Sequence, residues 1–351
     1  METQESLVYH QNELKIYEPS VLQDLQMRVL DSPSEDTSVW FPIPREGEVS
    51  YESRIDIDSI DITTEYVDAL NNYLDRALDD FTGFSKPKCD GFVVALSGGL
   101  DSAVSTELLN KYCKAKGCNL KILVMGEGDH NEYIDRYLGT PAEWIDIQYA
   151  KLMCQENNLD FEYLDITRDI KALRDRYTKK WAISGQLPRL RANHLYAMAE
   201  EHDLISVGTT NGSEYILAAF STGGPAGNIA PLLDLYKTEV YAIARDIGIP
   251  KYIQERMPLI NELNLPDNSF YGRTVDSTIL DPIIRRLWFH KQNPIKVAKE
   301  LGHSERWVRD IDEKRIKGES CRRNYKGLLI NRGFHFEDLS PDLFVDRSYF
   351  I

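Results

Sequence analysis

Residues 91–112 read GFVVALSGGLDSAVSTELLNKY and decide the fold of this chain. The apolar run 91–96 predicts a buried parallel strand, and 103–117 predicts a helix that ends at Gly117. Between them stand two glycines, two serines and an aspartate. Glycines allow a sharp turn in which successive N–H groups face one point, and the start of the helix adds its dipole there. The stretch therefore predicts a site that binds phosphate groups.

The polar side chains of this turn indicate which ligand it takes. Ser97 and Ser102 can donate hydroxyls to phosphate oxygens, whereas Asp101 would repel phosphate unless a cation lay between them, so Asp101 implies Mg²⁺. A functionless turn between strand and helix is the alternative, and a Gly-Gly alone would favour it. The full Ser-Gly-Gly-X-Asp-Ser pattern favours the phosphate site. The chain has no Gly-Lys-Ser/Thr, which disfavours a Walker-type NTPase.

Strands alternate with helices on either side of this stretch. Apolar strand-like runs at 120–126, 159–166 and 204–209 are separated by helical patterns at 142–158 and 189–203. This alternation predicts an α/β fold with a doubly wound parallel sheet flanked by helices. We predict three parts: an irregular arm (1–60), the main domain (61–329, with a helical C-terminal part from about 275) and a tail (330–351). The first helix of the main domain is expected to begin near Thr63.

Composition narrows the function classes. No apolar run approaches the ~20 residues of a membrane-spanning helix, and the polar, acidic start resembles no targeting signal, so we expect a cytoplasmic protein without a membrane partner. The net charge of −15 disfavours binding to nucleic acid, which needs clustered Lys and Arg. The five cysteines show no paired metal spacing and are expected to be reduced.

The segment SGGLDS resembles the PP-loop of the ATP pyrophosphatases, which split ATP between the α and β phosphates to adenylate a substrate. Within that superfamily the chain resembles the NAD synthetase family over about residues 70–329. LISVGTTNGSEYILAAF (204–220), LPRLRANHLYAM (187–198) and NIAPLLDLYKTEVYAIARDIGIP (228–250) carry this resemblance.

The resemblance implies a role for each matched residue. ATP contacts are implied for Ser97, Gly98, Gly99, Asp101, Ser102, Met125, Arg189, Thr209 and Lys237, with Asp101 and Lys237 catalytic and Asp101 and Glu214 holding Mg²⁺. Acceptor contacts are implied for Arg191, Asn211, Thr222, Asn228, Arg322 and Arg323. Two carboxylates that follow two parallel strands can hold one hard cation against a pyrophosphate.

Departures from the family pattern lie on the acceptor side. Thr222 stands where the family has a lysine, Asn228 stands where ammonia-dependent members have an aspartate, and the loop at 259–273 is rebuilt. Loss of one cation from a polyphosphate site removes about 1.5–3 kcal/mol of binding free energy. The acceptor is therefore either deamido-NAD held by another cation or a smaller, less charged acid. Residues 1–60 are too short for the family's glutaminase domain, so ammonia must be free or come from a separate glutaminase.

The sequence thus predicts an ATP-dependent amide ligase that adenylates a carboxylate, releases pyrophosphate and AMP, and transfers ammonia, with deamido-NAD as the acceptor the family supplies. A related ligase for another small carboxylate is one alternative. A PP-loop enzyme that modifies tRNA is disfavoured because the chain lacks a basic RNA-binding appendage and a Cys-X-X-Cys pair. A non-catalytic nucleotide-binding subunit would not need both Asp101 and Glu214. The resemblance also implies a homodimer.

Overall fold

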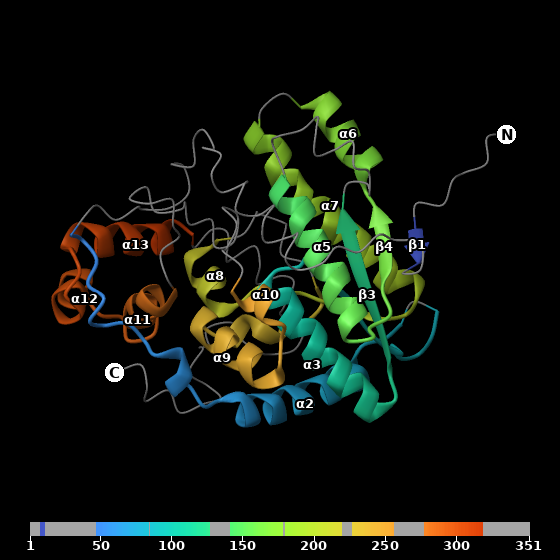
Figure 1. The fold of residues 1–351 in the computed structure, drawn as a ribbon, viewed down its shortest axis with the longest axis horizontal. Coiled ribbons are helices and arrows are strands. Elements are labelled where there is room, and N and C mark those ends of the chain that lie inside the picture. The colour runs from blue at the N-terminus through green and yellow to red at the C-terminus, as the bar shows by residue number, and fades with distance from the viewer. Residues whose placement is uncertain are drawn as a thin grey trace.

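The computed structural model describes residues 8–10, 47–83, 85–126, 141–177, 180–219, 227–255 and 277–318. One sheet runs through the molecule in the strand order β1-β4-β3-β2-β5 (Figure 1). The parallel strands are β2 (Gly91–Ala95), β3 (Asn119–Gly126), β4 (Glu162–Asp165) and β5 (Ile205–Val207). The predicted doubly wound parallel sheet, flanked by helices, is confirmed.

The strand β1 (Val8–His10) pairs antiparallel with β4 and forms one edge of the sheet. This strand lies within the arm that the sequence analysis expected to be irregular, and the prediction missed it. Three residues are too few to show an alternating pattern, and the pairing is made by backbone groups.

The order in which successive strands are added to the sheet changes direction at β2. From β2 the chain continues to β3 and β4 on one side, and it then returns to place β5 on the other side. In open parallel sheets of this kind, ligands bind outside the carboxyl ends of the strands at the point of reversal. In this chain that point lies between β2 and β5.

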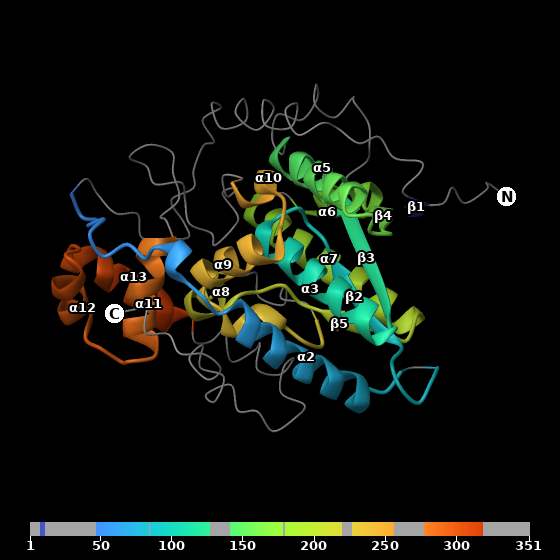
Figure 2. The ribbon, with the colours of Figure 1, turned by 60° about the horizontal axis from the view of Figure 1, so that its bottom comes forward.

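Helices cover both faces of the sheet (Figure 2). On one face, Phe92, Val94, Ile122 and Val124 pack in the main core with α2 (Thr63–Asp80), α3 (Leu100–Lys116), α5 (Pro141–Glu156) and α9 (Lys237–Ile247). On the other face, Val93, Leu123 and Met125 pack against α6 (Thr167–Arg176) and α7 (Lys180–Glu201). Two short helices, α8 (Gly212–Leu217) and α10 (Lys251–Gln254), complete this part of the chain. Alternate strand residues thus serve opposite layers.

The two predicted helix boundaries are confirmed. Helix α2 begins at Thr63, and α3 ends before Gly117, which takes the left-handed conformation (φ +72°) typical of a helix end. In the last turns of α2, Ala77 is buried, whereas Leu78, four residues after the buried Leu74, is only half-buried. The reason is that positions four apart drift around a helix of 3.6 residues per turn.

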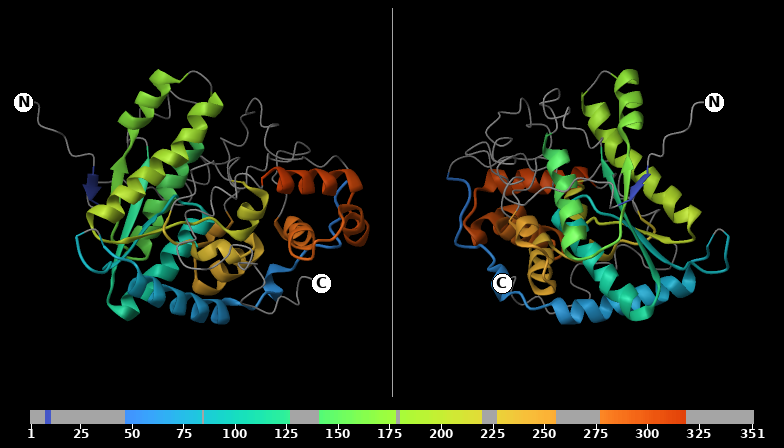
Figure 3. Two further views of the ribbon diagram at one scale, coloured as in Figure 1. Left: turned by 180° about the vertical axis from the view of Figure 1, so that it is seen from behind. Right: turned by 45° about the vertical axis from the view of Figure 1, so that its right-hand side comes forward.

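Three helices near the C-terminus form a group at one end of the molecule: α11 (Ser277–Trp288), α12 (Pro294–Leu301) and α13 (Glu305–Lys317) (Figure 3). Residues 47–60, with a 3₁₀ turn η2 at Ile57–Ser59, pack along them. Pro282 has no N–H to donate to the carbonyl of Thr278 one turn earlier in α11, and this carbonyl accepts a hydrogen bond from Ile55 N at 3.0 Å. No helix in the described ranges has the length and apolarity needed to cross a membrane.

Candidate active site

The turn after β2 has a fixed conformation. Gly98 has φ +87°, and a Cβ there would lie 1.9 Å from the carbonyl oxygen of Asp146 in α5, so only glycine fits. Ser102 Oγ donates to Gly99 O at 2.9 Å and accepts from Ser97 N at 3.1 Å. Gly99 is the residue that precedes α3, and Ser97 is exposed. The turn therefore presents a hydroxyl beside the free N–H groups of a helix start, as a phosphate site requires.

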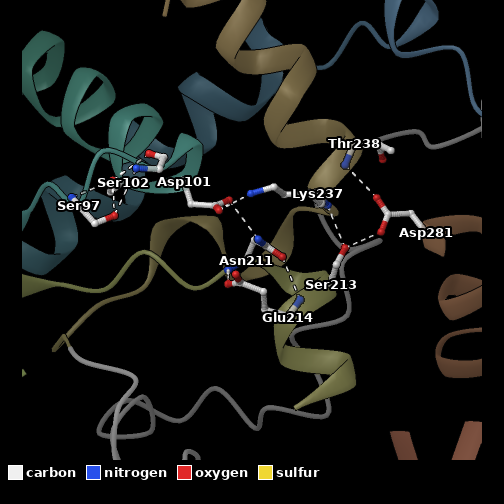
Figure 4. A network of polar contacts seen from close by, with 10 residues as sticks. Ser97, Asp101, Ser102, Asn211, Ser213, Glu214, Lys237, Thr238 and Asp281 are labelled. Atoms are coloured by element: carbon white, nitrogen blue, oxygen red, sulfur yellow. Dashed lines mark hydrogen bonds and ion pairs between the residues drawn. The ribbon is translucent and has the colours of Figure 1, made fainter. Parts of the chain in front are cut away.

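Asp101 joins this turn to two distant segments (Figure 4). Its buried carboxylate accepts a hydrogen bond from Asn211 Nδ2 at 3.0 Å and forms an ion pair with Lys237 Nζ. Asn211 immediately precedes α8, and Lys237 is the first residue of α9. The structure thus brings three separate sequence motifs together at the carboxyl end of β2.

Glu214 reaches the same place through Asn211. Asn211 Oδ1 accepts from Glu214 N at 2.9 Å, while Glu214 Oε2 accepts from Asn211 N at 3.2 Å, which is a reciprocal cap at the start of α8. One asparagine therefore contacts both carboxylates predicted to hold the metal.

The oxygen donors of this pair suit Mg²⁺. Magnesium is usually held by one or two protein carboxylates and takes its other ligands from phosphates and water. The described residues contain no cluster of three or more His, Cys, Asp and Glu side chains that would form a metal site without substrate. Asp101 and Glu214 together therefore fit a magnesium ion that arrives with a nucleotide.

A second layer of polar contacts lies behind Lys237. Ser213 Oγ donates to Asp281 Oδ1 at 2.7 Å and accepts from Lys237 N at 2.9 Å, and Thr238 N donates to Asp281 Oδ2 at 2.8 Å (Figure 4). Burial raises the pKa of Asp281 to about 7. Ser213 and Asp281 were not predicted from the sequence. The available signal was one aspartate on the apolar face of the segment 277–288.

Four other predicted site residues lie in the described part of the chain. Met125 is buried near the end of β3, Thr209 follows β5, and Arg189 and Arg191 are half-buried on α7. Thr222, Arg322 and Arg323 lie outside the described residues, as does the loop at 259–273.

Two residues predicted to contact the acceptor have other contacts in the structure. Asn211 is fully buried, and both polar atoms of its side chain are used, on Asp101 and on Glu214 N. Asn228 Oδ1 accepts from Ser206 N at 3.1 Å and from Ser206 Oγ at 2.5 Å, which holds residues 227–229 beside β5. The structure therefore gives Asn211 and Asn228 positioning contacts, and their contact with an acceptor stays a prediction.

The family model for NAD synthase matches residues 70–325 of the chain, which is nearly the whole of the described fold. Curated relatives agree with this match. The NH(3)-dependent NAD(+) synthetase of Thermococcus kodakarensis is 29% identical over 257 residues, which cover 70% of this chain and 94% of that one. The enzyme of the same name from Saccharolobus solfataricus is 27% identical over 77% of this chain and 94% of its own.

Solved structures share the fold. The NMN synthetase from Francisella tularensis superposes with a TM-score of 0.55 at 23% identity, covering 74% of this chain and 95% of that one. The NH3-dependent NAD synthetase from Campylobacter jejuni superposes with a TM-score of 0.57 at 18% identity, covering 75% and 96%. At these identities the structural likeness supports the fold alone.

Proposed function

The chain belongs to the NAD synthase family and is an ATP-dependent carbon–nitrogen ligase; from this premise we propose that it adenylates the carboxylate of deamido-NAD and transfers ammonia to it. The observation that carries the proposal is the meeting of Asp101, Asn211 and Lys237 at the point where the strand order reverses. Each residue comes from a different motif, and together they adjoin a turn that is built for phosphate.

The main task of the chain's own groups would be to bind the phosphates of ATP and to neutralise their negative charge. The Ser97–Ser102 turn would bind phosphate oxygens through the free N–H groups at the start of α3, and Lys237 would neutralise charge on the departing pyrophosphate. Asp101 and Glu214 would hold Mg²⁺, which supplies positive charge to the polyphosphate when it is bound. Attack of the acceptor carboxylate on the α-phosphorus then forms an acyl adenylate, and ammonia displaces AMP from its acyl carbon.

Ammonia itself is the proposed nucleophile for the second step. The purified chain should respond to ammonium and to rising pH, because only NH₃ carries the free electron pair that attacks. Glutamine alone should support no turnover unless a separate glutaminase is added. Turnover with glutamine in the pure chain would contradict the proposed nitrogen source.

A second candidate acceptor is a smaller nicotinate-bearing nucleotide. Thr222 in place of the family lysine favours this candidate, because the site would then carry one cation fewer for a dinucleotide pyrophosphate. One structural neighbour is described as an NMN synthetase, so the mononucleotide acid belongs among the acceptors to be tested.

The deciding experiment measures pyrophosphate release with ATP, Mg²⁺ and ammonium across a panel of carboxylates. The proposal expects the highest kcat/KM with deamido-NAD. If kcat/KM for deamido-NAD is several decades lower than kcat/KM for the mononucleotide acid, while ATP binding is unchanged, the mononucleotide acid is the acceptor and deamido-NAD is not. A homodimer also stays a proposal, which sedimentation of the purified chain tests.

A further inference from the structure

The carboxylate of Asp281 contacts the starts of both helices that approach Asp101, although it comes from a third helix, α11. We infer that Asp281 is a positioning residue of the adenylating site, which joins the first turns of α8 and α9 and so orients Lys237 and Glu214 toward Asp101. This inference rests on the proposed function, because the site that it serves is the proposed ATP site.

The contacts of Asp281 are complementary to its charge. It is completely buried, and it receives one hydrogen bond from a hydroxyl in α8 and one from a backbone N–H in α9. The starts of two helices carry partial positive charge, which stabilises a carboxylate placed between them. A buried carboxylate without such partners would be strongly unfavourable.

The route from Asp281 to Lys237 is short. Ser213 Oγ donates to Asp281 and accepts from Lys237 N, while the next residue, Thr238, donates its own N–H to Asp281. Two consecutive backbone groups of α9 are therefore fixed through one carboxylate. The side chain of Lys237 leaves that fixed turn and forms its ion pair with Asp101.

The same carboxylate acts on α8. Ser213 lies next to Glu214 in the first turn of that helix, which also holds the Asn211 cap. A backbone hydrogen bond from Gly212 N to Leu235 O, 2.7 Å long, joins α8 to the segment before α9 without Asp281. Removal of the carboxylate should therefore change the orientation of the Lys237 and Glu214 side chains more than it changes the fold.

Asp281→Asn tests the inference with little change in volume. The amide oxygen can accept from Thr238 N while the NH₂ group donates to Ser213 Oγ, so the hydrogen bond to Ser213 reverses its direction and the negative charge of the carboxylate is lost. The affinity of the full-length variant for Mg–ATP is measured by calorimetry, together with kcat and KM for pyrophosphate release. We expect about a tenfold weaker affinity for Mg–ATP and a lower kcat.

A double-mutant cycle distinguishes positioning from general loosening. If Asp281 acts through Lys237, Asp281→Asn should weaken ATP binding about tenfold in the wild-type chain and less than twofold in a Lys237→Met chain. An equal effect in both backgrounds would overturn the inference. If Asp281→Asn does not fold, Ser213→Ala removes the same link, and the cycle is repeated with it.

Asp203→Asn is the matched control. Asp203 is also buried, and its carboxylate accepts hydrogen bonds from the backbone N–H of Ser85 at 2.7 Å and from the Ser85 hydroxyl, but it lies beside the amino ends of β2 and β5. It should lower the melting temperature and leave the affinity for ATP unchanged. An equal loss of affinity in both variants would contradict a specific role for Asp281.

The outcomes separate this inference from the proposed function. A wild-type chain that binds Mg–ATP but releases no pyrophosphate with any acceptor would refute the proposed function, while the cycle on affinity would still decide the role of Asp281. Normal release by wild type and by Asp281→Asn alike would refute the positioning role alone. Absence of Mg–ATP binding in wild type would refute both.

Discussion

Two clusters of polar groups differ in how their side chains are paired and in what lies beside them. At the carboxyl ends of β2 and β5, Asp101 and Lys237 are charged, buried and adjacent to the exposed Ser97 and the free start of α3. At the other cluster, which we call the junction (Glu48, Ser50, Ser53, His303 and Arg306), the segment 47–60 meets α12 and α13. Both clusters join residues far apart in the sequence, but only the first adjoins a glycine-rich turn.

The junction uses its polar atoms on itself. His303 Nδ1 accepts from Ser50 N at 3.0 Å, its Nε2 lies 3.3 Å from Ser53 Oγ, and its ring packs edge-on against Trp307 at 5.4 Å. Burial lowers the pKa of His303 to about 4, so the imidazole is neutral at pH 7. A buried ion pair beside a helix start therefore indicates chemistry, whereas a buried neutral histidine bonded to neighbouring serines indicates a structural joint.

The largest expected effect is at Asp101. Asp101→Asn should reduce pyrophosphate release at least about 100-fold, because it removes the charge proposed to hold Mg²⁺. It also leaves the buried Lys237 without its ion-pair partner and should lower the melting temperature. Glu214→Gln should act in the same direction, and it can keep the cap of α8. His303→Gln at the junction is the contrast and should leave kcat within about twofold. Normal turnover in Asp101→Asn would remove the distinction between the two clusters.

Gly98→Ala tests whether the turn itself is required. A methyl group would meet the Asp146 carbonyl at 1.9 Å in a backbone conformation with positive φ, so we expect a loss of about 2 kcal/mol or more in unfolding free energy and at least tenfold weaker ATP binding. The control is Gly117→Ala at the other end of α3, where φ is +72° and no atom lies within 4 Å of the added Cβ. It should cost about 1 kcal/mol and leave ATP binding unchanged. Equal losses of ATP affinity would show that the turn has no special part in binding.

The junction should respond to pH. The unfolded chain protonates His303 near pH 6.5 and the folded chain only near pH 4, so the unfolding free energy should fall as the pH decreases through this interval. One pKa unit corresponds to about 1.4 kcal/mol, and after solvent screening we expect a loss of about 2 kcal/mol. Guanidinium titrations at pH 7 and pH 4.5 measure it. In His303→Gln the unfolding free energy should change less between pH 7 and pH 4.5. If it changes as much as in the wild-type chain, other groups control the pH dependence.

The smallest effect is expected at Arg306. Its guanidinium bonds to Glu48 Oε1 at 2.7 Å and to Asp310 at 2.7 Å while it is partly exposed to solvent. Arg306→Gln should therefore cost less than about 1 kcal/mol, and less still at high salt. Melting curves at two salt concentrations give the value. A measurable change in ATP affinity in this variant would connect the junction to the site.

Sequence predicted the parts whose signals are local. The turn at 97–102, the end of α3 at Gly117 and the alternation of strands with helices each depend on neighbouring residues. The pairing of β1 and the docking of Ile55 could not be predicted in this way. They depend on backbone groups, and one of these is the carbonyl of Thr278, to which Pro282 cannot donate.

The same reason explains why the role of Asp281 and the internal contacts of Asn211 could not be predicted. Asp281 acquires its role from Ser213 and Thr238, which lie 68 and 43 positions away in the chain and share no motif with it. Asn211 lies in a recognised segment, from which a contact with the acceptor is predicted and stays a prediction. Its burial and its hydrogen bonds to Asp101 and Glu214 depend on the packing of distant segments.

The strand order also determines when the site can form during synthesis. Asp101 is 110 residues from Asn211 and 136 residues from Lys237, so closing these contacts needs long loops. When only the glycine-rich turn and α3 of a nascent chain have left the ribosome, Asn211 and Lys237, the partners of Asp101, are not yet available. The nucleotide can therefore stabilise the fold only after α9 has left the ribosome, and until then the growing chain depends on its apolar core alone.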